Sequence, residues 1–150
     1  MKKNIALFAA LLSLSLTATA QSSETKGPVI KFEKTDHNFG IFDLENANKS
    51  YYFKFTNTGD EDLVITDVYA SCNCTVPEYP KYKIAPGQTD SIKVSYNGAT
   101  RRPGVFRKVV TVNYNAKTQD DSFARITITG EMVDRDVLEQ INELDAEYKK

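Results

Sequence analysis

The sequence predicts an all-β protein: an immunoglobulin-like two-sheet sandwich of about seven strands, with an N-terminal signal peptide and a C-terminal helix. Two observations predict the sandwich. Apolar and polar residues alternate over short segments such as residues 51–56, and turn residues separate these segments at regular intervals. The chain has no Trp, and its two cysteines are close in sequence, so it lacks the features of an antibody-type domain. A closed barrel is the alternative architecture.

The first twenty residues have the organisation of a secretory signal peptide. Lys2 and Lys3 form a positive start, residues 5–16 are apolar apart from two serines, and Ala18-Thr19-Ala20 fits a cleavage site. The apolar run is shorter than the roughly 20 residues that span a bilayer, although an uncleaved anchor is the alternative. We expect a mature chain that begins at Gln21 and a periplasmic location, with an extracellular one also open.

The remaining residues, 21–150, are enough for one domain with its own core. Without Lys2 and Lys3 the formal net charge changes from −1 to −3. This mixed composition gives no basic surface for nucleic acid and no polybasic patch for a membrane. We expect a disordered lead-in over residues 21–28, the sandwich over residues 29–133 and a helix over residues 134–150.

The strands of the first half are expected in pairs. Residues 29–33 and 37–42 read as one edge strand in two pieces. Residues 51–57 and 63–69 form a predicted hairpin around a tight turn at residues 57–60, where Asn, Gly and Asp tolerate a positive φ.

The second half contains three more predicted strands. Pro86-Gly87 suits a type II turn before residues 92–96, and Pro103-Gly104 introduces residues 105–114. The last strand covers residues 123–132. Alternation within the strands predicts a core that contains Phe53, Phe55, Ile65, Val94, Ile126 and Ile128.

After residue 133 the apolar period changes from strand-like to helical. One helical stripe is formed by Val137, Ile141, Leu144 and Tyr148. Asp134 or Asp136 can cap the start of this helix. About four turns are marginal in isolation, so the stripe needs a surface to cover. It could pack on its own sandwich, pair with its copy in a second protomer as a homo-oligomer, or dock on a partner.

Six short motifs occur along the chain in this order: Asp36-His37-Asn38-Phe39-Gly40, Phe53-x-Phe55-x-Asn57-x-Gly59, Leu63-Val64-Ile65, Ser71-Cys72-x-Cys74-Thr75, Ile84-x-Pro86-Gly87 and Ile128-x-Gly130. Together they resemble a family of exported bacterial domains of unknown function. That family is similar in fold to the Hydin-type and major-sperm-protein-like immunoglobulin-like domains. The resemblance implies a sandwich in a periplasmic or cell-envelope setting, and it brings no activity, substrate or cofactor. Asn73 stands where the family more often has Gly, and Asn tolerates the positive φ of a turn.

Cys72 and Cys74 are the only reactive-looking chemistry. On an extended strand their sulfurs would share one face and could hold a soft ion such as Cu(I), although two ligands do not complete a zinc site. In a bent segment the same residues could close a disulfide or act in thiol exchange. Thiol exchange would need an electropositive surrounding that the sequence does not show.

His37 is the obvious third metal ligand, but strand lengths place it away from the cysteines, and we expect it to make a local hydrogen bond within a sheet. No phosphate loop, nucleophile elbow or H-E-x-x-H motif is present, so we expect no enzymatic activity and no cofactor. The sequence therefore predicts a non-catalytic envelope module that binds a protein of unknown identity. Binding would use the loops near Cys72 and Cys74 or the C-terminal helix; a copper or thiol-exchange protein is the alternative.

Overall fold

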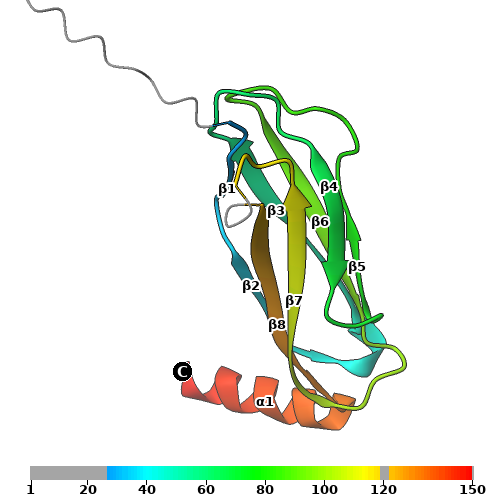
Figure 1. Ribbon diagram of the computed structural model, residues 1–150. Coiled ribbons are helices and arrows are strands. Elements are labelled where there is room, and N and C mark those ends of the chain that lie inside the picture. The colour runs from blue at the N-terminus through cyan, green and yellow to red at the C-terminus, as the bar shows by residue number, and fades with distance from the viewer. Residues whose placement is uncertain (1–26, 119–121, 150) are drawn as a thin grey trace, which may run out of the picture.

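The computed structural model describes residues 27–118 and 122–149, which fold as a two-sheet sandwich with one helix at its end (Figure 1). The expected signal peptide, residues 1–20, lies outside the described residues. Sheet A contains, in spatial order, β1 (Ile30–Phe32), β3 (Asn48–Asn57), β6 (Thr89–Asn97) and β5 (Thr75–Glu78). Sheet B contains β2 (Asp36–Asp43), β8 (Phe123–Val133), β7 (Gly104–Tyr114) and β4 (Ile65–Ala70). The predicted fold class is confirmed, with eight strands in place of about seven.

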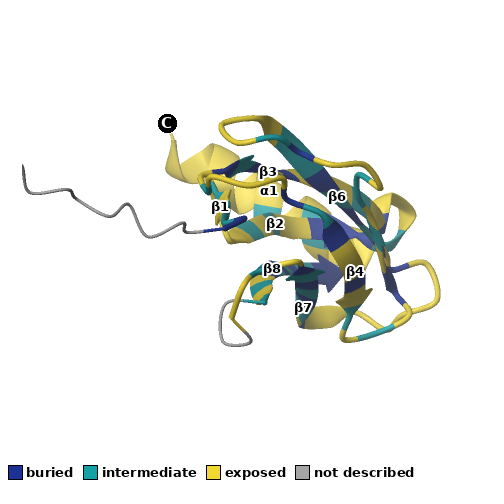
Figure 2. Ribbon diagram, turned by 45° about the horizontal axis from the view of Figure 1, so that its top comes forward, coloured by how far each residue is buried: buried dark blue, intermediate teal, exposed yellow. Residues whose placement is uncertain are grey.

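The core lies between the sheets and is built from the alternating residues of both. All six predicted core residues are buried: Phe53, Phe55, Val94, Ile126 and Ile128 at 0% exposure and Ile65 at 4%. Figure 2 shows the buried residues concentrated on the facing strands, while no residue of α1 is buried. The predicted type II turn is also present, because Gly87 has a φ of +77° and the amide of Gln88 donates to the carbonyl of Ala85.

The expected edge strand in two pieces divides between the two sheets. β1 pairs antiparallel with β3 in sheet A, whereas β2 pairs parallel with β8 in sheet B. The amide of Thr127 donates to the carbonyl of Thr35 where the chain crosses over. Each piece is an edge strand, as predicted. The period of two in a sequence is the same for either sheet, so it could not show that the segment changes sheets.

The predicted hairpin between residues 51–57 and 63–69 is wrong. β3 belongs to sheet A and pairs with β1 and β6, whereas β4 belongs to sheet B and pairs with β7. The intervening chain crosses between the sheets, and Leu63 forms an isolated bridge with Ile84 on the way. Residues 57–60 therefore have the composition of a tight turn but begin a crossing from sheet A to sheet B.

The side chain of Asn57 organises this crossing. It is completely buried, and its amide nitrogen donates to the carbonyls of Glu61 at 2.7 Å and Ile84 at 2.9 Å. Its oxygen accepts from the amides of Gly59 at 3.0 Å and Val29 at 3.3 Å. One side chain thus satisfies four backbone groups from three segments, which a backbone turn alone could not connect.

Gly59 is required because the backbone of Gly27 passes very close to it, and not because it has a positive φ. Its φ lies outside the positive range, and a Cβ on this residue would come within 1.9 Å of the Gly27 carbonyl oxygen. Gly27 is itself buried and donates its amide to Asp60, so the end of the expected lead-in belongs to the folded domain. The prediction of disorder over residues 21–28 is therefore wrong for Gly27 and Pro28, which are both buried; residues 21–26 lie outside the described residues.

The predicted C-terminal helix is present as α1 (Arg135–Tyr148). Asp134 occupies the N-cap position, but its side chain makes no capping hydrogen bond, so that expectation is corrected. Asp136 lies in the first turn, where a carboxylate interacts favourably with the helix dipole. Arg135 forms an ion pair with Glu45 of the short 3₁₀ helix η1 (Leu44–Asn46), which holds the start of α1 near the end of β2.

Candidate functional site

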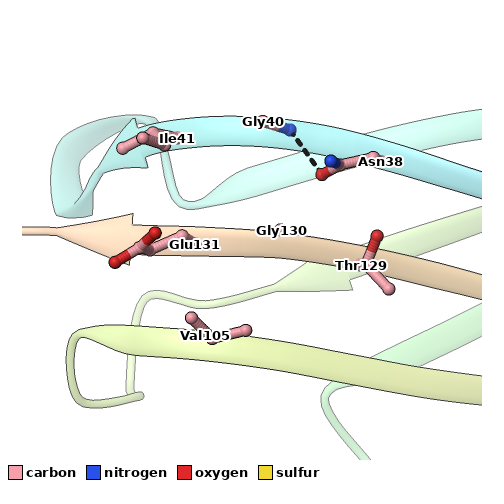
Figure 3. A pocket seen from close by; sticks show the side chains of 7 residues that line it. All are labelled: Asn38, Gly40, Ile41, Val105, Thr129, Gly130 and Glu131. Atoms are coloured by element: carbon pink, nitrogen blue, oxygen red, sulfur yellow. Dashed lines mark hydrogen bonds between the residues drawn. The ribbon is translucent and has the colours of Figure 1, made fainter.

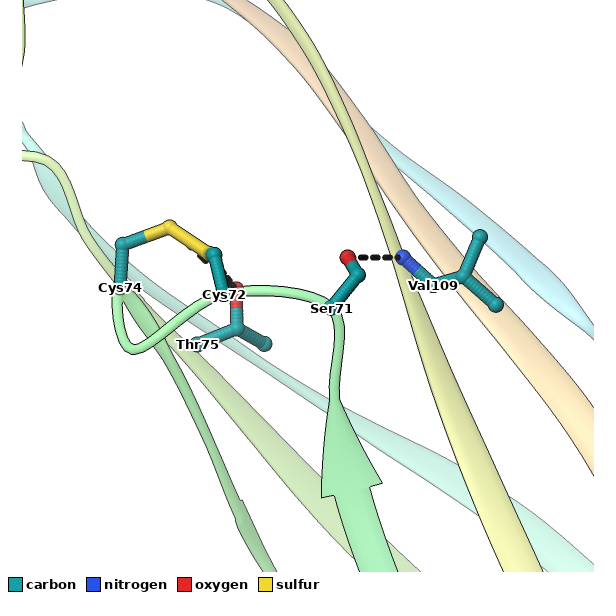
Figure 4. The surroundings of a disulfide bond; sticks show 5 residues. All are labelled: Ser71, Cys72, Cys74, Thr75 and Val109. Carbon is teal, nitrogen blue, oxygen red and sulfur yellow. Dashed lines mark hydrogen bonds between the residues drawn. A yellow bond between two sulfur atoms is a disulfide. The ribbon is translucent and has the colours of Figure 1, made fainter.

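Cys72 and Cys74 form a disulfide in the loop that carries the chain from β4 in sheet B to β5 in sheet A (Figure 4). Their Cα atoms are 5.3 Å apart, a separation that a disulfide can bridge. Of the states open to this pair, the structure has the bridged one. A bridged pair offers no thiolate, so this form cannot bind Cu(I) through its sulfurs.

Hydrogen bonds fix both sides of the bridged loop. The amide of Ser71 donates to the carbonyl of Val109 at 2.9 Å, and the amide of Val109 donates to the Ser71 hydroxyl at 3.2 Å. The Thr75 hydroxyl lies 3.5 Å from the Cys72 sulfur. Cys74 is buried and Cys72 is half-buried, so a nucleophile from solution would reach the Cys72 sulfur first.

The turn between the cysteines does not use a left-handed residue. No residue other than glycine has a positive φ in the described parts of the chain, which include Asn73. The expectation that Asn73 replaces Gly through its tolerance of positive φ is therefore wrong. Asn73 is exposed and sits in a turn of ordinary backbone conformation.

The imidazole of His37 is held by aromatic packing and not by the expected hydrogen bond. It stacks on the ring of Tyr51 with centroids 3.7 Å apart, and the ring of Phe39 meets it edge-on at 4.7 Å. Partial burial lowers the pKa of His37, and the nearby Lys34 lowers it further while Asp36 opposes the change. His37 is therefore neutral near pH 7 and is part of the packing between the sheets.

His37 and the disulfide are separate, as predicted, but for a different reason. His37 on β2 pairs with Ile128 on β8, and Ile128 pairs with Lys108 on β7. The next residue on β7, Val109, is hydrogen-bonded to Ser71 beside the disulfide. The two sites are thus level along the strands. They are separated across the sheet, because β2 and β4 are its opposite edges, three strand spacings or roughly 14 Å apart. Among the described residues, no three His, Cys, Asp or Glu side chains gather where a metal ion could bind.

α1 leaves its apolar stripe uncovered. None of its residues is buried, and Val137, Leu144 and Tyr148 are 40%, 67% and 92% exposed, while Ile141 is half-buried. Figure 1 shows α1 lying across one end of the sandwich with its C-terminal part extending beyond the sheets. α1 lies close to β2, but the expected packing on its own sandwich leaves most of the stripe in solvent. No helix among residues 27–118 and 122–149 is both long and apolar enough to cross a bilayer.

A hollow on the outer face of sheet B was not predicted from the sequence. Gly40 has no side chain to fill it, and a Cβ there would meet nothing within 4 Å. Ile41, Glu131 and Val105 form one row across three strands at its rim (Figure 3). Val105 is 79% exposed and Ile41 45%. The hollow lies at the same end of sheet B as α1, so both surfaces leave apolar side chains in solvent there. The Asn-x-Gly spacing of Asn38 and Gly40 was the available signal, since the Asn38 side chain accepts from the Gly40 amide.

These features define an immunoglobulin-like two-sheet sandwich with a bridged C-x-C loop and an exposed C-terminal helix. The chain belongs to the family described as "Protein of unknown function (DUF1573)", whose model matches residues 30–132. The family resemblance predicted from the six motifs is thereby confirmed. Among curated proteins, none matches the chain.

Solved structures show the same fold at low sequence identity. A protein of unknown function from Porphyromonas gingivalis W83 is 12% identical with a TM-score of 0.61, over 76% of this chain and 51% of that one. The ASH/PapD-like domain 7 of human CEP192 is 10% identical with a TM-score of 0.52, over 84% and 98%. The periplasmic chaperone SfaE is 12% identical with a TM-score of 0.53, over 67% and 55%. The chain thus spans about half the length of the first of these, and the likeness concerns the fold alone.

Proposed function

We propose that this protein is a non-catalytic module of the cell envelope that recognises another protein through α1. The observation that carries the proposal is the uncovered stripe of Val137, Ile141, Leu144 and Tyr148 on a helix with no buried residue. A helix of this length is marginal unless its apolar face is covered, and an amphipathic helix commonly docks in an apolar groove. We place the protein in the periplasm, after cleavage behind Ala20.

The charges of α1 indicate the chemistry of the partner. The helix carries five carboxylates and a single arginine, and Asp136 and Glu147 flank one side of the stripe. Two such helices would repel each other, which argues against a homo-oligomer built on α1 pairing with its copy. The surface that fits is an apolar groove with lysine or arginine side chains at its rim.

A matched pair of substitutions tests this proposal. Leu144→Glu places a charge in the stripe, while Ala146→Glu adds the same charge on the exposed opposite face. With the immobilised mature chain, we expect wild type and Ala146→Glu to capture the same protein from an envelope extract and Leu144→Glu to lose it. Capture should also weaken at high salt, since screening reduces attraction between exposed charges. Equal capture by both variants would place the binding surface elsewhere, for example at the loops near Cys72 and Cys74.

Thiol-disulfide exchange is the second candidate, and the half-exposed Cys72 sulfur favours it over copper binding in the bridged form. In exchange, a substrate thiolate would attack this sulfur, forming a mixed disulfide and releasing Cys74 as a thiolate. The buried position of Cys74 disfavours that charged product. The binding module is therefore the better-supported function.

The cysteines also give a quantitative expectation. Thiol titration of the unfolded, unreduced protein should find no free thiol, and two after reduction. A bridge that closes only three residues restricts the unfolded chain little, so replacing both cysteines with Ser should lower the free energy of unfolding by only about 1.5 kcal/mol. A reduced protein that loses its fold would contradict this local role. Reduction of a test disulfide by the reduced wild type, absent in the double Ser variant, would favour the exchange function.

A further inference from the structure

A shallow depression on the outer face of sheet A collects three tyrosines from segments far apart in sequence. Tyr52 comes from β3, while Tyr79 and Tyr82 come from the chain that follows β5. Tyr52 and Tyr82 are 57% and 63% exposed, so their rings present apolar surface to solvent. A group of exposed aromatic rings bordered by polar side chains is a common feature of binding surfaces.

Neighbouring side chains fix these rings in place. The Tyr82 hydroxyl donates to an Asp90 carboxylate oxygen at 2.5 Å, and this hydrogen bond raises the pKa of Tyr82. The Lys81 ammonium lies 3.4 Å from the centroid of the Tyr79 ring, which also packs against the core. A preordered aromatic surface loses less side-chain entropy when a ligand binds.

Polar groups between the rings are balanced in charge. Lys93 lies opposite Tyr52 in the strand pairing and forms an ion pair with Glu78 at 2.9 Å. The carboxylates of Glu78 and Asp90 keep acceptor capacity beyond these bonds, since each has about four lone-pair sites. The lining itself has one lysine, Lys93, and two carboxylates. The ammonium of Lys81 over the Tyr79 ring adds a second positive charge beside it, so little net charge remains to attract an ion. The surroundings fit a neutral ligand with many hydroxyl donors.

We propose that this depression binds a neutral oligosaccharide. The C–H faces of its sugar rings lie on Tyr52 and Tyr82, and its hydroxyls donate to Asp90 and Glu78. The volume of about 260 Å³ is below the roughly 300–1,000 Å³ of pockets that enclose a small ligand, so the saccharide lies across the surface as a chain. This site is independent of α1, so it extends the proposed function.

The test uses cellohexaose and chitohexaose, two neutral β-linked probes with flat apolar ring faces. Because the chain has no Trp, its intrinsic fluorescence comes from its eight tyrosines, three of which lie at the depression. We expect a saturable fluorescence change with at least one probe, supported by calorimetry. Tyr52→Ala should weaken binding tenfold or more. Tyr69→Ala, which removes a tyrosine that is 53% exposed on β4 of the other sheet, should bind like wild type.

Three outcomes would overturn the proposal: no saturable response to either probe, equal loss in Tyr52→Ala and Tyr69→Ala, or binding of a decaproline peptide instead of both sugars. The last outcome would assign the tyrosines to an extended proline-rich segment. Tyr52→Phe keeps the ring at the same position, so it controls for misfolding of Tyr52→Ala; it should retain saccharide binding. Leu144→Glu should bind the sugars normally, which separates this site from the proposed protein-binding helix.

Discussion

Replacing Phe53 with Ala is expected to lower the free energy of unfolding by about 3–5 kcal/mol. Phe53 is completely buried in β3, and the ring of Tyr51 meets it edge-on with centroids 4.9 Å apart. The sandwich core cannot collapse around the missing ring without moving strands of both sheets, so a cavity remains. Urea denaturation followed by circular dichroism measures the change.

The neighbouring Lys54 provides a matched control on the same strand. Its side chain is exposed, so Lys54→Ala should change the stability by less than about 0.5 kcal/mol. If Phe53→Ala also costs less than about 1 kcal/mol, the inward and outward faces of β3 have been assigned the wrong way round.

Replacing Asn57 with Ala is expected to cost about 2–4 kcal/mol, although the change in volume is small. The carbonyls of Glu61 and Ile84 and the amides of Val29 and Gly59 would all lose a partner in or near the interior. Thr58→Ala, at an exposed neighbouring position, should have little effect on the same melts. Equal stability of wild type and Asn57→Ala would mean that water replaces this side chain without cost.

Asn57→Asp separates the hydrogen bonds that the Asn57 side chain donates from those that it accepts. The substitution keeps an acceptor oxygen but directs a carboxylate towards two carbonyls in a buried place, which should raise its pKa above that of the unfolded chain. The loss of unfolding free energy caused by the carboxylate is smallest at a pH below the pKa of the introduced carboxyl group in the unfolded chain. It grows as the pH rises towards the pKa in the folded chain, and it is constant above that value. Stability relative to wild type should therefore recover in acid. A pH-independent difference would show that the donor bonds to the two carbonyls matter little.

The core and the strand segments could be predicted because alternation within a strand depends only on the immediate sequence. Phe53, Phe55, Ile126 and Ile128 followed from that rule alone. The pairing of strands could not, because residues 57–60 have the composition of a tight turn whether the chain reverses in one sheet or crosses to the other. Asn57 and Gly59 serve the crossing through contacts with Gly27, Val29 and Ile84, which are remote in sequence.

The candidate sites were predictable to different degrees. The stripe of α1 was visible as a helical period, and only its exposure had to come from the structure. A C-x-C pair is compatible with an extended or a bent backbone, so the bridged state of Cys72 and Cys74 was one of several expectations. The tyrosine depression could not be predicted at all, because Tyr52, Tyr82 and Asp90 come from separate segments that only the folded sheet brings together.

The position of β8 has a consequence for how the chain acquires its structure. β8 is the last strand in sequence, yet it lies inside sheet B, between β2 near the start of the chain and β7. The first and last strands of this sheet can pair only after nearly the whole chain is available, and such long-range pairings form slowly. A chain interrupted before Phe123 would leave β2 with no partner in its sheet and the adjacent edge of β7 open. Sheet B therefore cannot be completed during synthesis until its final strand has emerged.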